Sequence, residues 1–178
     1  MLFRSIAIIN KVDSADPEKV EQVRKTIERN NPSAEILLAD SAVLPEDPGA
    51  IRGRRVLVVE DGPTLTHGEM SYGAGVIAAR RFGAAGLVDP RPFLEGSLVK
   101  TFADYPGIGA LLPAMGYSPA QIRDLEATIN RTPCDLVLSA TPIDLARILA
   151  IRHPVQRIRY EYRRSEERRV GKECRSRW

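Results

Sequence analysis

Short runs of apolar, β-branched residues alternate with helix signals along most of the chain, and this alternation constrains the fold more than any other feature. Four runs are typical of buried strands: SIAIIN (5–10), EILLA (35–39), RVLVVE (55–60) and DLVLSA (135–140). Asp16-Pro17 and Ser118-Pro119 each place an N-cap residue before a first-turn proline. Strands and helices in series demand a mostly parallel sheet with crossover helices, so the predicted fold class is α/β.

The same signals predict the remaining elements, and SIAIIN has the composition of a strand that is buried on both faces. We expect helices over 17–30, about 69–82, 92–104 and from Ser118 onward, and one more capped by Thr141–Asp144. We expect strands at 86–89 and 155–160, and irregular chain over 106–115, where Gly and Pro are frequent. Ligands in such sheets sit beyond the carboxyl ends of the strands, so these ends are where chemistry is expected.

Charge, cysteine content and hydropathy exclude several classes of protein. The 178 residues carry 26 Lys plus Arg against 23 Asp plus Glu, a net charge of +3, of which +2 belongs to Ser165–Trp178. That segment resembles read-through from a cloning vector or adapter, and without it the charge gives no case for a nucleic-acid partner. Two Cys cannot build a disulfide framework, and no apolar run approaches the roughly 20 residues that span a bilayer. We therefore expect a cytoplasmic protein with neither nucleic-acid nor membrane partners.

The first strand ends in Asn-Lys-Val-Asp, the Asn-Lys-x-Asp pattern with which P-loop GTPases read guanine. The Asp carboxylate accepts hydrogen bonds from the ring N1–H and the exocyclic amino group, a pattern that adenine does not offer. The next strand runs into Ser-Ala, where a second base-contacting loop is expected. The predicted nucleotide-binding residues are Asn10, Lys11, Asp13, Ser41 and Ala42. The alternative, that Asn10 and Asp13 only cap a turn, stays open.

A phosphate-binding loop of the form G-x-x-x-x-G-K-[ST] does not occur in the sequence. P-loop enzymes need this loop for phosphoryl chemistry, and it would precede the guanine motif. Here the motif begins nine residues after Met1. The expectation is therefore that the chain is a fragment of a longer enzyme, unless the motif is accidental.

The third strand leads into EDGPTLTHGE, the densest group of reactive side chains in the sequence. Carboxylates at a strand end suit Mg²⁺, usually through water, and this predicts Glu60 and Asp61 as metal ligands. Asp61 and His67 are the catalytic candidates, because a histidine can act as general acid or base near neutral pH. Thr64 and Thr66 are predicted to contact the acceptor substrate or a phosphate. The alternative is that Asp61 or Thr66 caps a helix and His67 makes one structural hydrogen bond.

Two later residues are further candidates for phosphate binding. Thr141 follows the strand DLVLSA at the start of a predicted helix, where backbone N–H groups can hold an anion. Arg91 lies between two prolines in a stiff turn. The alternatives are a simple N-cap role for Thr141 and a solvated surface position for Arg91.

Several segments together resemble the C-terminal part of a prokaryotic GTPase-like family related to cyclic 2,3-diphosphoglycerate synthetase. The likeness covers about residues 6–162 and is carried by INKVDSADPE, RRVLVVEDGPTLTHGEMSYGAGVIAARRFGA, LVDPRPF, YPGIGALLPAMGYS, LEATIN and ATPIDL. It implies a cytoplasmic P-loop nucleotide-binding enzyme that uses Mg²⁺ with GTP or ATP on a small phosphorylated substrate. It also implies that a Rossmann-like domain and the phosphate loop lie upstream of the segment present here.

The resulting prediction is part of a GTP- or ATP-dependent phosphoryl-transfer enzyme that is inactive alone. Residues 1–53 would belong to the guanine-reading domain and 54–164 to a family-specific α/β region, and 165–178 would be a non-native or disordered tail. The expected partners are the nucleotide, the phosphorylated substrate and the missing N-terminal half, and a homo-oligomer stays open. The alternative is a non-catalytic module that binds a nucleotide or a partner protein and regulates it.

Overall fold

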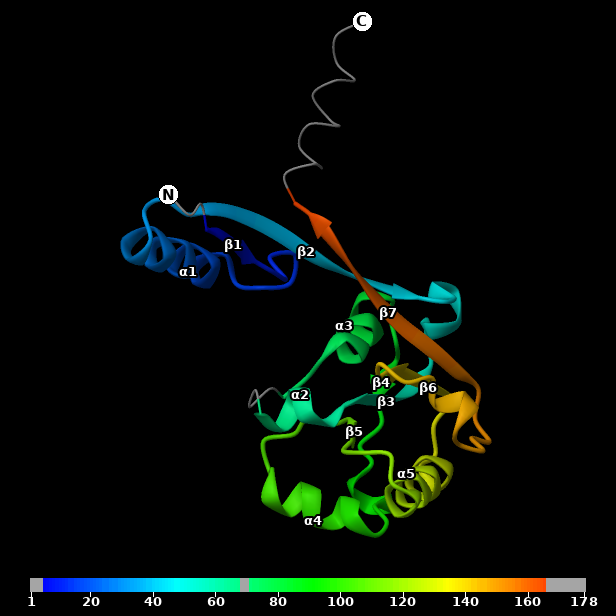
Figure 1. The fold of residues 1–178 in the computed structure, drawn as a ribbon. Helices are drawn as coiled ribbons and strands as arrows, with labels where there is room; N and C mark the ends of the chain where they lie inside the picture. The colour runs from blue at the N-terminus through cyan, green and yellow to red at the C-terminus, as the bar shows by residue number, and fades with distance from the viewer. Residues whose placement is uncertain (1–4, 68–70, 166–178) are drawn as a thin grey trace, which may run out of the picture. The chain divides into compact units, whose positions relative to one another are not determined.

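The structure, a computed structural model, describes residues 5–67 and 71–165 (Figure 1). The chain divides into two compact units, Val43–Arg159 and a smaller one made of Met1–Ala42 with Tyr160–Trp178. Among the described residues, no helix has both the length and the apolar character that crossing a membrane requires.

The smaller unit contains one strand–helix–strand motif. Strand β1 (Ile6–Ile9) leads into helix α1 (Pro17–Asn30) and strand β2 (Glu35–Pro45). The two strands are parallel, and their register begins at the pair Ile6 and Glu35. The Asp16 carboxylate accepts the backbone N–H of Glu18 at 2.9 Å, as the N-cap signal predicts. Strand, helix and parallel pairing here confirm the expectation from the sequence.

The expectation that the first strand is buried on both faces is wrong for the described residues. Ile9 is buried, but Ile6 is 62% and Ile8 55% exposed. Side chains alternate along a strand, so Ile6 and Ile8 share the face opposite that of Ile9. A single helix, α1, packs beside this strand, and one helix can cover only one face.

The larger unit is built around strand β3 (Arg55–Asp61). Its partners are β4 (Gly86–Leu87), β5 (Leu112–Ala114) and β6 (Leu136–Ala140), and β6 pairs in turn with β7 (Val155–Arg164). All four of these pairings are parallel. The run from Val56 to Val59 is fully buried. A mostly parallel sheet with connecting helices confirms the α/β class.

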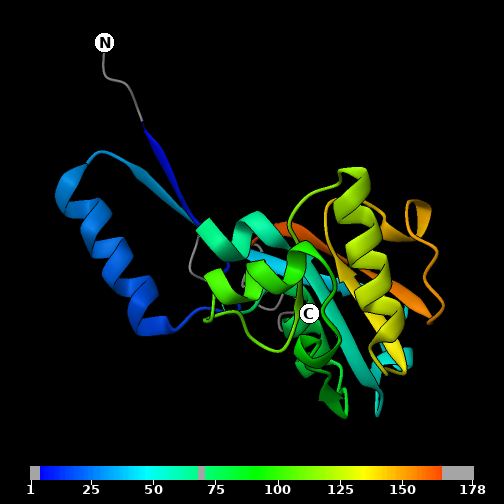
Figure 2. The same cartoon turned by 90° about the horizontal axis from the view of Figure 1, so that it is seen from below.

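Helices cover this sheet on both sides. They are α2 (Gly62–His67), α3 (Ala74–Arg81), α4 (Ser97–Asp104) and α5 (Pro119–Arg131), with short 3-10 turns η1 (Pro48–Ile51), η2 (Arg91–Phe93) and η3 (Leu145–Arg147). Helix α3 packs against β3 and β6, while α4 and α5 contact each other on the opposite side (Figures 1 and 2). The capping box that opens α5 is present: Ser118 and Gln121 each bond the other's backbone N–H.

Three predicted helices differ from the structure. The helix predicted over 69–82 begins only at Ala74, with Gly73 as its N-cap, and residues 68–70 lie outside the described residues. The helix predicted over 92–104 is interrupted because Gly96 takes a φ of +53°, so η2 and α4 are separate elements. The helix expected after Thr141–Asp144 is only the 3-10 turn η3.

Three strands also extend or appear beyond the predictions. The segment expected to be irregular over 106–115 contains β5, which pairs with Val59–Asp61 of β3. Strand β2 continues through Ser41 to Pro45, and β7 continues past Tyr160 to Arg164. The first residue of the predicted tail, Ser165, donates its backbone N–H to the carbonyl of Leu38, and residues 166–178 lie outside the described residues.

Candidate functional site

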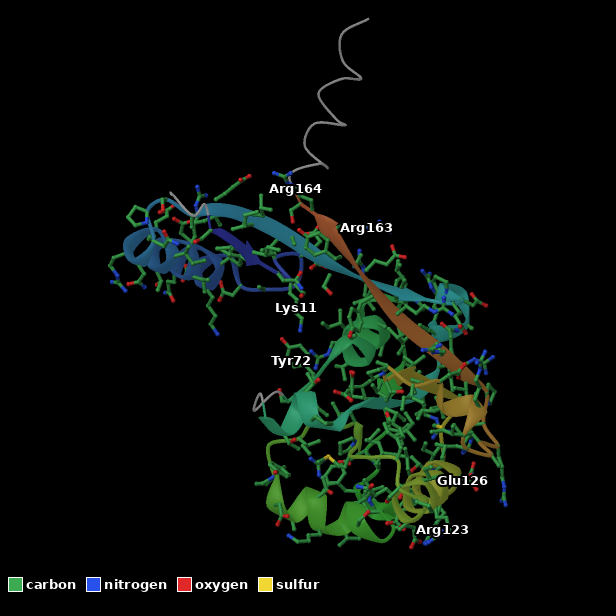
Figure 3. All side chains as sticks on the ribbon, viewed as in Figure 1. Lys11, Tyr72, Arg123, Glu126, Arg163 and Arg164 are labelled. Atoms are coloured by element: carbon green, nitrogen blue, oxygen red, sulfur yellow. The ribbon has the colours of Figure 1, made fainter. Side chains whose placement is uncertain are left out.

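The predicted base-reading segment forms a tight turn directly after β1. Lys11 adopts a left-handed conformation, φ +64°, and its carbonyl accepts the backbone N–H groups of Ser14 and Ala15. The Asn10 side chain accepts the N–H of Lys11 at 2.8 Å. The Lys11 side chain projects away from the ribbon (Figure 3), and Asn10, Lys11 and Asp13 are all exposed. The turn therefore presents its polar side chains to solvent.

A side-chain hydrogen bond joins this turn to the second predicted segment. Oδ1 of Asp13 accepts the backbone N–H of Ser41 at 3.0 Å, and the N–H of Val12 donates to the carbonyl of Ala39. Ser41 is half-buried and Ala42 is buried, and both lie inside β2 rather than in a loop after it. The two segments predicted to contact the base, Asn10–Asp13 and Ser41–Ala42, are therefore in contact with each other.

At the carboxyl end of β3, Glu60 points into the sheet–helix interface. It is 4% exposed, and its Oε1 accepts the N–H groups of Gly75 at 2.8 Å and Val76 at 3.1 Å. Burial raises the pKa of Glu60 from 4.5 to about 7, although the backbone N–H groups act in the opposite direction. The carboxyl group closes the first turn of α3.

Asp61 lies one residue further along the strand and is only partly buried. Its Oδ2 accepts the hydroxyl of Thr64 at 2.8 Å. The Thr66 hydroxyl donates to the carbonyl of Gly62 within α2. His67 is the last residue of α2, but the prediction for its side chain falls outside the described residues.

The fit of a divalent cation at this strand end depends on Asp61. Nowhere in ranges 5–67 and 71–165 do three His, Cys, Asp or Glu side chains converge. Oε1 of Glu60 is engaged by two backbone N–H groups. A Mg²⁺ ion that arrives with nucleotide phosphates keeps several waters and needs only one or two protein carboxylates. Asp61 can supply one such carboxylate.

The Arg91 guanidinium is engaged by neighbouring protein groups. It bonds the Asp89 carboxylate at 2.7 Å, donates to the carbonyl of Ile108 and lies 5.2 Å from the centre of the Phe102 ring. These contacts tie the turn after β4 to α4 and the loop that follows it. The sequence-based role in phosphate binding stays a prediction that competes with this structural one.

Strands β3, β5 and β6 are parallel, so their carboxyl ends lie at one edge of the larger unit's sheet. Asp61 is opposite Ala114 of β5, and Glu60 is opposite Ala140 of β6. Residues that follow β5 and β6 therefore lie near Asp61. Two hydroxyl-bearing residues follow these strand ends closely in the sequence. Thr141 comes directly after β6, and Tyr117 lies three residues after β5.

Thr141 and Tyr117 add hydroxyl groups to this edge. The buried Thr141 hydroxyl donates to the carbonyl of Ile143 at 2.7 Å, and its oxygen is 3.2 Å from that of Ser139. The Tyr117 hydroxyl is buried near Asp61 and interacts with the Thr141 side chain, although the two groups do not meet strict hydrogen-bond geometry. Burial and the Asp61 charge raise the pKa of Tyr117, although the interaction with Thr141 acts in the opposite direction, so the phenol is neutral.

Sequence reasoning missed Tyr117 because the preceding strand was not recognised. Once β5 is known to end at Ala114, an aromatic hydroxyl three residues later belongs to the same set of strand ends as Asp61 and Thr141. The signal was therefore present in YPGIGALLPAMGYS, but only in combination with the sheet pairing.

Comparison with known proteins gives one informative similarity. The chain is 49% identical over 156 residues to arginine synthetase ArcE of Thermococcus kodakarensis. The match covers 88% of this chain and 35% of the archaeal protein, so the chain spans about a third of that relative's length. No family model matches the chain.

Proposed function

We propose that this chain is part of a nucleotide-dependent synthetase of arginine chemistry, in which the turn after β1 binds the purine base and the β3 strand end binds the substrate. The observation that carries the base-binding half is the Asp13–Ser41 hydrogen bond, because it holds the carboxylate at a fixed position on an exposed turn. The substrate half draws on the similarity to an arginine synthetase, which the chain matches over part of that protein's length.

Guanine fits the turn better than adenine does. With Oδ1 of Asp13 held by the Ser41 N–H, the exposed carboxylate offers acceptors to a ring N1–H and an exocyclic amino group. Adenine presents an acceptor at N1 and cannot return this pattern. The exposed Lys11 stem can lie along the ring face. GTP is therefore the proposed nucleotide, and ATP is the alternative.

Mg²⁺ belongs to this proposal as the ion that accompanies the nucleotide phosphates, where it would neutralise their charge. A phosphate-binding loop would come from the part of a longer protein that this chain does not include. The chain alone would then bind nucleotide weakly and turn over none, in the cytoplasm where nucleoside triphosphates are available. The resemblance to cyclic 2,3-diphosphoglycerate synthetase favours a phosphorylated acceptor substrate. The similarity to an arginine synthetase favours arginine, and we propose arginine chemistry.

The Asp13→Asn variant tests base recognition. Asn keeps an oxygen for the Ser41 N–H, so the turn is retained, but its amide nitrogen donates where the carboxylate accepted. Xanthine carries a carbonyl in place of the guanine amino group. Fluorescence titrations with labelled GTP, XTP and ATP should show GTP affinity falling by about tenfold or more and XTP affinity rising.

Glu28→Gln is the matched control, because it removes one exposed carboxylate charge from α1 without touching the turn. If the order of GTP, XTP and ATP affinities is unchanged in Asp13→Asn, then Asn10–Asp13 form only a structural turn and do not contact the base. Nucleotide hydrolysis by the purified 178-residue chain would contradict the proposal that this chain is inactive alone. Binding of nucleotide by this chain, with no turnover even in the longer protein, would favour a regulatory module.

A further inference from the structure

Strand β1 exposes apolar side chains on one face of the smaller unit's strand pair. Ile6 is 62% and Ile8 55% exposed, whereas Ile9, on the other face, is buried. The register pairs Ile8 with Leu37 of β2, so Leu37 lies on the same face as Ile8, and it is only half-buried. We refer to Ile6, Ile8 and Leu37 as the open β1 face.

Helix α1 also has apolar surface that the two strands of the smaller unit leave uncovered. None of its 14 residues is buried. Val20, Val23 and Ile27 recur at helical spacing, but Val23 remains 47% exposed. A helix between parallel strands normally buries such a stripe against the sheet. The described strands therefore give α1 too little sheet to pack on.

The outer edge of β1 is a third uncovered feature. In the strand order β1 stands at the end, and β2 is its one neighbour among the described residues. Proteins protect such edges from pairing with other chains by placing charged residues or proline on them. The strand sequence IAII contains neither. This edge is therefore suited to pairing with a further strand.

The parallel pairing of β1 with β2 indicates what kind of segment would cover these features. Parallel sheets carry helices on both faces, as β3 does in the larger unit. Parallel neighbours are joined by crossover connections, usually helices of the same polypeptide. The match with the archaeal relative covers 35% of that protein, so most of its length is available to supply such elements.

We propose that the open β1 face and the outer edge of β1 form the docking surface for the remaining part of a longer synthetase. That part would add a parallel strand beside β1 and a helix over Ile6 and Ile8. This deepens the proposed function, on which it rests for the existence of the longer protein. Strand β1 ends at Ile9, directly before Asn10. Chain docked here would therefore lie next to the proposed base site, where a phosphate-binding loop is needed.

Hydrogen exchange followed by mass spectrometry tests this docking. It compares the 178-residue chain with a joined protein, in which the complete chain replaces the matched segment of the archaeal relative. The amides of β1 should exchange about tenfold or more slowly in the joined protein, because a neighbouring strand and helix shield them. The amides of α4 should exchange at the same rate in both proteins, since α4 belongs to the larger unit.

Ile8→Lys and Val99→Lys form a matched pair, because Ile8 is 55% and Val99 of α4 54% exposed. Neither should move the urea midpoint of the chain alone. In the joined protein, Ile8→Lys should return the β1 amides to the exchange rate of the chain alone, whereas Val99→Lys should keep wild-type protection. Ile8→Thr and Val99→Thr keep the β-branched shape and give the same comparison if lysine disturbs the strand.

Three results would overturn the proposal. The first is equal exchange of the β1 amides in the chain alone and in the joined protein. The second is a lower urea midpoint of the chain alone with both Ile8 substitutions and neither Val99 substitution, because the face would then already be covered. The third is a wild-type dimer in sedimentation that Ile8→Lys dissociates, which assigns the face to a second copy. If the joined protein does not fold, rapid exchange of the corresponding strand in the intact archaeal relative has the same meaning as the first.

The GTP titrations of Asp13→Asn separate this proposal from base binding. Slow exchange of β1 in the joined protein, together with an unchanged nucleotide preference in Asp13→Asn, would confirm docking and contradict base recognition. Lost GTP preference in Asp13→Asn, with no slowing of β1 exchange, would confirm base recognition and contradict docking.

Discussion

The Glu60 carboxylate accepts the backbone N–H of Gly75 at 2.8 Å and so closes the first turn of α3 from the neighbouring strand. Val76 donates to the same oxygen at 3.1 Å. Helix starts leave several N–H groups without partners inside the helix, and here a strand residue supplies the acceptor. The acceptor is an ionisable group with a pKa raised by burial to about 7, so the cap is sensitive to pH.

The first prediction is that Glu60→Gln flattens part of the pH dependence of stability. The folded pKa lies above the ordinary 4.5, so folding favours the protonated form. Stability from this group is complete below about pH 4.5 and is lost as pH rises to about 7. At about 1.4 kcal/mol per pKa unit, the difference between 4.5 and about 7 corresponds to about 3 to 4 kcal/mol. Gln keeps the acceptor oxygen and cannot ionise.

Urea unfolding of wild type and Glu60→Gln between pH 4 and 8 measures this effect. The free energy of unfolding of Glu60→Gln relative to wild type should rise with pH through this window and level off above about pH 7. Glu126→Gln is the control. The Glu126 carboxylate also accepts a backbone N–H, that of Ala150, but its side chain is less buried than that of Glu60. A difference that stays constant with pH would show that Glu60 does not titrate there.

The second prediction concerns the close approach of α3 to β3 at Gly75. A Cβ at this position would lie 2.6 Å from Cγ1 of Val58, which is fully buried. Gly75→Ala should therefore destabilise the protein by about 1–2 kcal/mol, since overpacking outweighs the gain in helix propensity. Gly86→Ala is the matched control, because its added Cβ would meet nothing within 4 Å.

A double-mutant cycle with Val58→Ala identifies the cause. Removal of Cγ1 creates the room that the methyl group added by Gly75→Ala needs, so this substitution should cost less in the Val58→Ala background. Chemical denaturation of the four proteins gives the coupling free energy. Strict additivity would mean that the strain arises elsewhere.

Elements of the larger unit could be predicted from the sequence where a local residue pattern identifies them. RVLVVE is apolar over its whole length and becomes the central strand β3, and Ser118 with Gln121 is a capping box both in sequence and in structure. These features depend on neighbours in the chain, so a local pattern suffices.

Features that depend on distant partners escaped the sequence analysis. The segment Leu112–Ala114 contains a proline between glycine-rich flanks, and it is a strand because it pairs with Val59–Asp61. Tyr117 was missed for the same reason. The Glu60 cap could not be predicted either, because it requires α3 to begin beside the end of β3. The site residues that could be named were those next to a recognisable strand end, such as Asp61.

The third prediction is that Asp124 of α5 stabilises the start of α4. Its Oδ2 accepts the backbone N–H of Ser97 at 2.9 Å and the Ser97 hydroxyl at 2.7 Å. The backbone bond is the main reason that the pKa of Asp124 is lowered. Asp124→Ala should therefore cost about 1–2 kcal/mol at neutral pH, as loss of a helix cap does.

Asp104→Ala is the matched control, because it also removes one carboxylate charge. The interaction lost with it is an exposed ion pair with Lys100 at the end of α4. Its effect should stay below about 0.5 kcal/mol. Since a lowered folded pKa means stability that is lost as pH falls, the two variants should become more alike in acid. Equal effects at pH 7 would contradict the capping role of Asp124.

The last prediction decides between the two roles of Arg91. Its guanidinium bonds Asp89, donates to the carbonyl of Ile108 and lies over the Phe102 ring. Lysine keeps the charge but cannot make the forked contact or stack in the same way. Arg91→Lys should therefore lower the free energy of unfolding by about 1 kcal/mol in urea titrations, whereas Arg81→Lys, at the exposed end of α3, should leave it unchanged. If Arg91 instead binds phosphate, the Lys variant keeps wild-type stability and titrations with inorganic phosphate show an altered affinity.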